Sequence, residues 1–129
     1  MPVAEYRAVD LDVRSHSSLG PLLDEWRWAQ TPAREGTEAP RWLLVTPPGL
    51  PKTADQAVRA LVRLVARLPP TARRCWNRAA ARTFDIGIQA GLAPFCFDDV
   101  RLKPRTIQAI ARIGGQLQIT VYAPTSAEQ

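Results

Sequence analysis

Apolar and polar side chains alternate along three stretches of the chain, the period-two pattern of strands with one buried face. These stretches are residues 5–14, 82–90 and 116–122. A fourth segment, residues 42–46, is a short apolar run between prolines, which is typical of a central strand. The pattern therefore predicts a sheet to which segments from both ends of the chain contribute.

Helical spacing of apolar residues marks three further segments. In residues 19–26, after two serines that suit a helix N-cap, apolar side chains recur at i, i+3, i+4 and i+7. A second helix, over residues 53–68, opens on a capping box formed by Thr53 and Gln56 and stops at a Pro-Pro pair. The third runs from a proline in its first turn to a Gly-Gly pair, over residues 104–115.

Two segments between these elements complete the predicted order. Residues 71–81 form either a further helical turn or a basic connection. Residues 91–94 have turn chemistry and 95–102 predict a short strand, so that 82–102 would form a hairpin. The element order is then β-α-β-α-β-β-α-β.

This order predicts the α+β class, with a single mixed or antiparallel sheet of four to five strands. Two helices would cover one face, in an arrangement of ferredoxin-like character. The 129 residues suit a single domain, with an ordered core at about 5–123 and a frayed C-terminal tail at 124–129.

The alternation also predicts which side chains meet in the core. In the last strand, Leu117, Ile119 and Val121 fall on one face, which we expect to be buried. The last helix would present an apolar stripe made of Ile107, Ile110 and Ala111. We therefore expect Ile86, Ile110 and Ile119 to be mutual neighbours in the core.

Positive charge is concentrated in one segment. The chain carries a net charge of +5, and residues 59–82 hold seven arginines and no acidic residue. Arg59, Arg63 and Arg67 recur every four residues on the polar side of the second helix, and repulsion between them needs offsetting by partners or by solvent. The partner-binding arginines that we predict are Arg59, Arg63, Arg67, Arg73, Arg74 and Arg78, with Arg82 extending the surface. They would dock an acidic macromolecule or phosphate groups.

The alternative interpretation of these arginines is a solvated face in an arginine-rich chain. Carboxylates from elsewhere, Asp10, Asp12 or Asp85, would then neutralise the charge. The same carboxylates, with Gln89 and Gln118, predict a polar and partly acidic sheet face if their strands are adjacent. Such a face could bind a partner, and we include Asp85 and Gln118 among the partner-binding residues. A cation site or acid–base pair is disfavoured, because the spacing matches no metal loop.

No stretch of the sequence predicts an active site, a metal site or a cofactor site. His16 stands alone between serines, and the two cysteines, Cys75 and Cys96, have no metal-binding spacing and are expected to be reduced thiols. The N-terminus lacks a signal-peptide pattern and no apolar run is long enough to span a membrane, which favours a cytoplasmic protein. Of the four tryptophans, we expect Trp28 and Trp76 near the surface, with Trp76 in the partner-binding region.

Several segments resemble a bacterial family known as domain of unknown function number 4279. They are SHSSLGPLLDEW near the start, Gly36 with the RWLLVTP strand, the helix TADQAVRALVRLVARLPP, and the ending LKPRTIQAIARIGGQLQITVY. The similarity spans about residues 9–122. It implies a small cytoplasmic immunity protein that inactivates a secreted bacterial toxin by occluding it, and the family has no established catalytic residues to carry over.

Two functional hypotheses follow. The first is a non-enzymatic immunity protein that binds a cognate toxin with an acidic surface. The second is a nucleic-acid-binding domain that uses the arginines of residues 59–82, although no RNP, KH or zinc-finger pattern is present.

Overall fold

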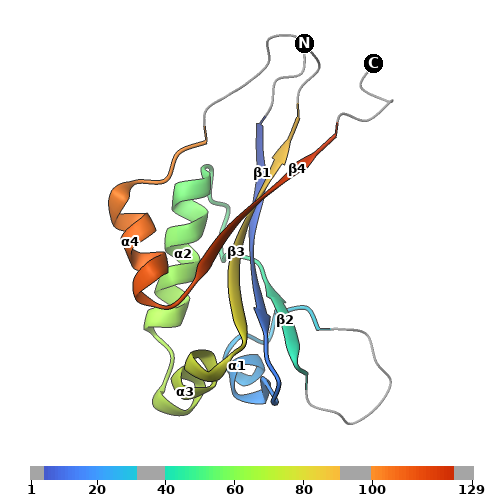
Figure 1. The fold of residues 1–129 in the computed structure, drawn as a ribbon, viewed down its shortest axis with the longest axis vertical. Coiled ribbons are helices and arrows are strands. Elements are labelled where there is room, and N and C mark those ends of the chain that lie inside the picture. Colours follow the sequence, from blue (N-terminus) through green and yellow to red (C-terminus); the bar gives the residue numbers. More distant parts are fainter. Residues whose placement is uncertain (1–4, 32–39, 91–99, 124–129) are drawn as a thin grey trace.

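Four strands and four helices make up the part of the chain that the computed structural model describes, residues 5–31, 40–90 and 100–123 (Figure 1). The strands are β1 (Glu5–Arg14), β2 (Trp42–Val45), β3 (Ala81–Gln89) and β4 (Gln116–Tyr122). The helices are α1 (Gly20–Glu25), α2 (Ala54–Ala66), α3 (Pro70–Arg78) and α4 (Pro104–Arg112). The predicted α+β class is confirmed.

The strands form one mixed sheet in the order β2-β1-β3-β4. β1 is antiparallel to both of its neighbours, and β3 and β4 are parallel, with α4 on the connection between them. β1 begins and ends at the predicted residues. β2 is an edge strand, so the prediction of a central strand at 42–46 is wrong.

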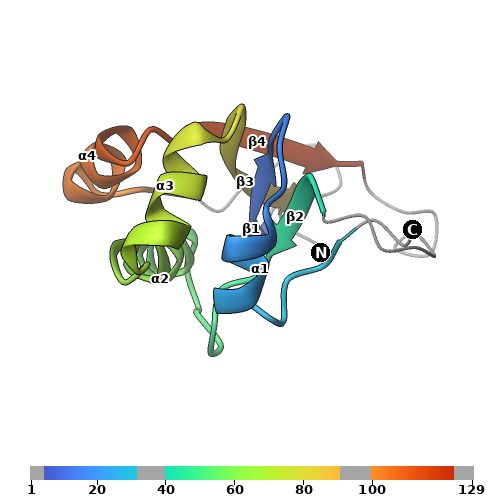
Figure 2. The same cartoon turned by 90° about the horizontal axis from the view of Figure 1, so that it is seen from below.

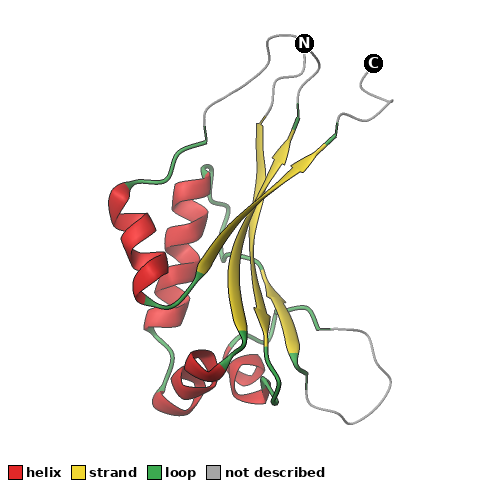
Figure 3. Cartoon of the chain, in the orientation of Figure 1, coloured by secondary structure: helices red, strands yellow, loops and turns green. Residues whose placement is uncertain are grey.

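The helices lie together on one side of the strands (Figures 2 and 3). Side chains from both layers form one buried cluster between them. Its largest fully buried members are Trp76, Phe84, Leu11, Leu19, Leu22, Leu43 and Leu61. Because β1 buries Val9, Leu11 and Val13 there, Asp10 and Asp12 point to the opposite face of the sheet.

The two segments between the other predicted elements have separate outcomes. Residues 71–81 are largely helical, as α3, which resolves that alternative in favour of a helix. The predicted strand at 95–102 and its turn at 91–94 lie mostly outside the described residues, and 100–102, which are described, are not strand. On the side away from β1, the strand that pairs with β3 is β4. The element order is therefore β-α-β-α-α-β-α-β, which departs from a ferredoxin-like arrangement.

The capping signals of α2 and α4 are confirmed, whereas the predicted serine N-cap of α1 is wrong: its N-cap is Leu19, and Ser18 Oγ only accepts from the Gly20 N–H at 3.0 Å. The Gln56 N–H donates to Thr53 Oγ1 at 3.1 Å, and the Gln56 side chain accepts from the Lys52 N–H at 3.0 Å. After α4, Gly114 takes φ +76°, the left-handed conformation that ends a helix without steric cost. The next residue, Gly115, is needed for a different reason, since a Cβ there would meet Phe84 Cε2 at 2.7 Å.

The buried side of α4 is rotated from the predicted stripe. Ile110 is buried, but Ile107 is 51% exposed and Ala111 is exposed. The side chain that joins Ile110 inside is Thr106, 2% exposed, whose hydroxyl donates to Asp55 Oδ1 on α2 at 2.6 Å. A polar contact between the helices therefore sets the rotation of α4, which apolar spacing alone does not reveal.

The prediction that Ile119 is buried is wrong. Leu117, Ile119 and Val121 pair in register with Phe84, Ile86 and Ile88 of β3, so they lie on the helix-facing side as expected. Their exposed fractions are nevertheless 45%, 58% and 62%. Alternation identifies the face of a strand, but burial also needs a second layer above it, and α4 does not extend over this edge.

Truncation of Ile86, Ile110 and Ile119 tests whether a side chain that faces the helix layer is also buried beneath it. Ile86→Ala and Ile110→Ala should each lower the free energy of unfolding by about 2–5 kcal/mol, because each leaves a cavity in the core. Ile119→Ala should cost less than about 1 kcal/mol in the monomer. Urea unfolding followed by tryptophan fluorescence measures all three. Equal losses at Ile110 and Ile119 would contradict the exposed position of β4.

Candidate functional site: a basic groove between α2 and α4

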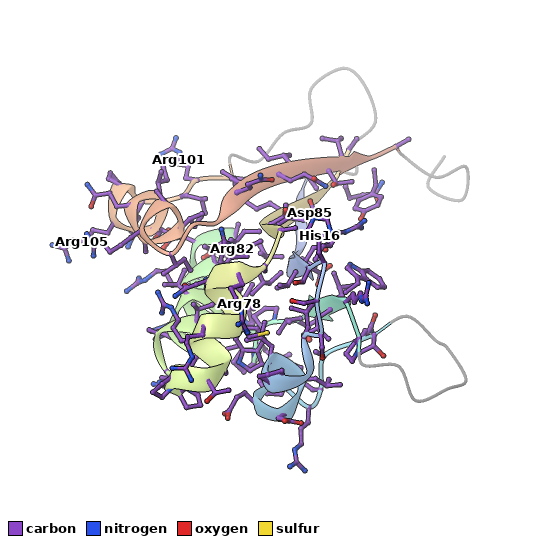
Figure 4. All side chains as sticks on the ribbon, turned by 60° about the horizontal axis from the view of Figure 1, so that its bottom comes forward. His16, Arg78, Arg82, Asp85, Arg101 and Arg105 are labelled. Carbon is purple, nitrogen blue, oxygen red and sulfur yellow. The ribbon has the colours of Figure 1, made fainter. Side chains whose placement is uncertain are left out.

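An open groove of about 730 Å³ lies between α2 and α4. Four basic side chains line it, together with apolar and small ones. We call it the basic groove; its lining is Arg59, Val62, Arg63, Lys103, Pro104, Arg105, Thr106 and Ala109. Two cations come from each helix, from parts of the chain that are 40 or more residues apart. Figure 4 shows Arg105 on the α4 side of the molecule, away from Asp85 on the sheet.

The helices place these cations by simple rules. Arg59 and Arg63 are four residues apart on α2 and so project from the same side of that helix. The buried stripe of Val58, Leu61 and Val65 holds that side outward. Lys103 and Arg105 flank the Pro104 that begins α4. The groove therefore exists only because α4 docks beside α2.

Asp55 fixes that docking. Asp55 is 6% exposed, and its carboxylate accepts hydrogen bonds from the Lys103 backbone N–H at 2.9 Å and from Thr106 Oγ1 at 2.6 Å. Burial alone raises the pKa of Asp55. The hydrogen bonds from Thr106 and Lys103 and the positive charge of Arg59 outweigh burial and hold the pKa below its ordinary value of 3.8. The carboxylate thus stays charged and joins α2 to the N-terminal end of α4, where a negative charge is favourable.

The groove keeps an excess of positive charge. Arg59 Nη1 lies 3.9 Å from Asp55 Oδ2, and no other arginine of residues 59–82 has an ion pair with a described carboxylate. Asp10, Asp12 and Asp85 lie on the opposite face of the sheet, where Asp12 pairs with Arg14 at 3.2 Å. They are therefore not placed to neutralise the helix layer, so this part of the alternative interpretation is wrong, whereas a solvated face stays a prediction.

The structure divides the predicted arginine surface. Only Arg59 and Arg63 reach the groove, whereas Arg67, Arg74 and Arg78 are exposed elsewhere on α2 and α3 or just after α2. Two others have structural contacts. The Arg73 guanidinium donates to the Val65 carbonyl at 3.3 Å. That of Arg82 donates to the carbonyls of Trp76, Asn77 and Gly114 at 2.9–3.1 Å.

Trp76 is not a partner-binding residue on a surface. Its side chain is 0% exposed, its indole N–H donates to the Ile113 carbonyl at 2.9 Å, and it packs edge-on against Trp26. The expectation of a surface position is therefore wrong. The signal was present in the sequence, since Ala72, Cys75, Trp76 and Ala79 recur at i, i+3, i+4 and i+7 and are all buried, but the arginines between them masked it. Trp28, by contrast, is 46% exposed, as expected.

The predicted polar sheet face is present. Asp10 and Asp85 are directly opposite each other on β1 and β3, and Asp85 accepts from Thr120 Oγ1 at 2.8 Å and from Gln118 Nε2 at 3.3 Å. Burial, and then the charge of Asp85, raises the pKa of Asp10. A hollow of about 430 Å³ lies here, between these two carboxylates, Gln89 and Tyr122. Asp85 and Gln118 thus lie on the face away from the arginines, so the predicted partner-binding residues do not form one surface.

Other candidate chemistry is sparse in the described ranges. They contain no group of three or more His, Cys, Asp or Glu side chains placed to hold a metal ion. His16 is exposed after β1. Cys75 is a free, buried thiol, whose pKa is raised by burial, while Cys96 is outside the described residues. No helix of the described part is long and apolar enough to cross a membrane.

Lys103 and Arg105 are the site residues that sequence reasoning missed. Two weak signals were available, namely basic residues on both sides of a helix-opening proline and a single aspartate at the start of an otherwise basic helix. Neither indicates which helices are neighbours, and the pairing of α2 with α4 is what makes the site.

Comparison with known proteins adds no identification. No protein-family model, curated protein or solved structure matches the chain. The resemblance to the family numbered 4279 therefore remains a prediction.

Proposed function

We propose that this chain is a non-enzymatic bacterial immunity protein. It acts in the cytoplasm and binds and occludes a cognate toxin domain through the basic groove. The partner presents acidic side chains to Arg59, Arg63, Lys103 and Arg105. The exposed arginines Arg67, Arg74 and Arg78 contribute long-range attraction at the margin.

The composition of the groove carries this proposal. Val62, Pro104 and Ala109 lie among the four cations, which gives the groove apolar surface between its charges. Protein interfaces combine apolar anchors with a charged margin, whereas sequence-independent binding of nucleic acid needs mainly phosphate contacts. The groove favours a protein partner on this ground, and the resemblance of the sequence to an immunity-like family favours a toxin as that protein.

Reversing groove charges tests the proposal. We expect Arg63→Glu/Arg105→Glu to slow association with the toxin-domain product of the adjacent gene by about tenfold or more. The variant should also flatten the salt dependence of association and change dissociation less, because steering acts before contact. Surface plasmon resonance at three salt concentrations measures these rates. The matched control is Arg27→Glu/Arg41→Glu, which makes the same charge change at two exposed arginines outside the groove.

The results distinguish three cases. Tight binding that neither double variant affects would move the interface away from the groove, most plainly to the sheet face around Asp85 and Gln118. No binding to that gene product would overturn the immunity proposal. Binding of random DNA or RNA duplexes with a steep loss of affinity in salt would instead establish the nucleic-acid function.

A further inference from the structure

In the described part of the chain, no strand pairs with the outer edge of β4. β4 pairs with β3 on one side, and it ends the sheet on the other. The opposite edge strand, β2, is only four residues long, and Gln30 bridges to its Leu44. Of the two sheet edges in the described part of the chain, β4 is thus the long one without a partner. In Figure 1, β4 begins beside α4 and runs away from it towards the C-terminus.

Natural edge strands usually carry charge, proline or a bulge that prevents pairing with another chain. β4 reads QLQITVY and has none of these features. It lies within residues 113–127, the longest stretch of this sequence without a charged side chain. Three of its apolar side chains are 45–62% exposed on one face. An edge of this kind favours sheet extension across a molecular interface.

We propose that β4 pairs antiparallel with β4 of a second copy of this chain, forming a two-fold symmetric dimer with one continuous sheet. With Ile119 on the two-fold axis, Ile119 lies opposite Ile119 and Leu117 opposite Val121, so the apolar rows of both copies share a face. Gln118 then lies opposite Thr120 on the polar face. A slip of one residue would place the two apolar rows on opposite faces, and a slip of two would shorten the ladder, so only this register pairs all 7 residues of β4 with the apolar rows together.

The charge of the chain and the exposure of the β4 side chains favour a second copy as the partner of this edge. Each chain has a net charge of +5, so two copies repel over most of their surfaces, and this repulsion is weakest where their uncharged β4 strands meet. An acidic partner would find no cation on this strand. The exposed fraction of the apolar side chains rises along β4 from Leu117 to Val121. Antiparallel pairing therefore places the less exposed Leu117 of one copy beside the more exposed Val121 of the other.

Analytical ultracentrifugation of the full chain tests the dimer. We expect the mass to rise from 14.3 kDa towards twice that value between about 5 and 500 µM chain, with dissociation in the micromolar range. Ile119→Lys should weaken the dimer by about tenfold or more, since it places like charges on the two-fold axis. Gln108→Lys adds the same charge on the exposed surface of α4 and should leave the dimer unchanged.

Disulfide trapping gives a second readout that does not depend on the stability of the lysine variant. Residues directly opposite in antiparallel strands have Cα atoms about 4.5–5.5 Å apart, within the span of a disulfide. Ile119→Cys in a Cys96→Ser background should therefore form a covalent dimer on mild oxidation, and Gln108→Cys should not. A wild-type chain that stays monomeric at every concentration, or equal cross-linking of both cysteine variants, would overturn the proposal.

Discussion

Trp76→Ala should lower the free energy of unfolding by about 3–5 kcal/mol, the usual range for removing a buried aromatic side chain. The change empties the space between α3, α1 and β3, and it leaves the Ile113 carbonyl without its indole donor. The guanidinium of Arg82, whose Cζ lies 5.9 Å from the centroid of the Trp76 ring, also loses its contact with that ring. Urea denaturation followed by circular dichroism measures the loss.

Trp28→Ala is the matched control for this prediction. Trp28 is 46% exposed and donates one hydrogen bond, to the Thr46 carbonyl at 3.0 Å, so its truncation should cost about 1 kcal/mol or less. A conservative variant, Trp76→Phe, should keep most of the packing and leave the association rate with the partner unchanged. A stable Trp76→Ala variant that has lost partner binding would show instead that Trp76 acts at an interface.

Asp55→Ala should lower the free energy of unfolding by about 2–4 kcal/mol at pH 7. It leaves the buried Thr106 hydroxyl and the Lys103 N–H without an acceptor, and it frees the first turn of α4 from α2. Asp24→Ala, at an exposed carboxylate of α1, removes the same charge and should change stability by less than about 0.5 kcal/mol.

The effect of Asp55 should depend on pH in a defined direction. The pKa of Asp55 is lower in the folded protein than its ordinary value of 3.8, so the unfolded chain binds the proton more readily. The stabilisation is therefore complete above about pH 5 and is lost as the pH falls through 3.8 towards the folded-state pKa. The stability difference between wild type and Asp55→Ala should shrink over this acidic range.

A double-mutant cycle with Thr106→Val isolates the contact. Since the hydroxyl and the carboxylate form one hydrogen bond, the double variant should lose less than the sum of the two single losses. Additive losses, or a difference between wild type and Asp55→Ala that stays constant down to pH 3, would contradict the anchoring role.

The sequence determined the local features of this protein. Alternation over Glu5–Arg14 gave the whole of β1, because period two is a property of the extended backbone itself. The Thr53–Gln56 pair marked the start of α2, and the glycine at 114 marked the end of α4, because capping depends on neighbouring residues alone. The charge excess of residues 59–82 was also visible, although its division among separate contacts was not.

Tertiary structure decided which elements are neighbours, and with that it decided burial and the site. Ile119 was assigned to the correct face, yet it is exposed because no helix extends over β4. Trp76 lies in the core because α3 packs against α1, although the basic residues around it favoured a surface position. Arg59 and Lys103 share a groove only through the contact of Asp55 with the start of α4. Such pairings join residues far apart in sequence, so no local pattern encodes them.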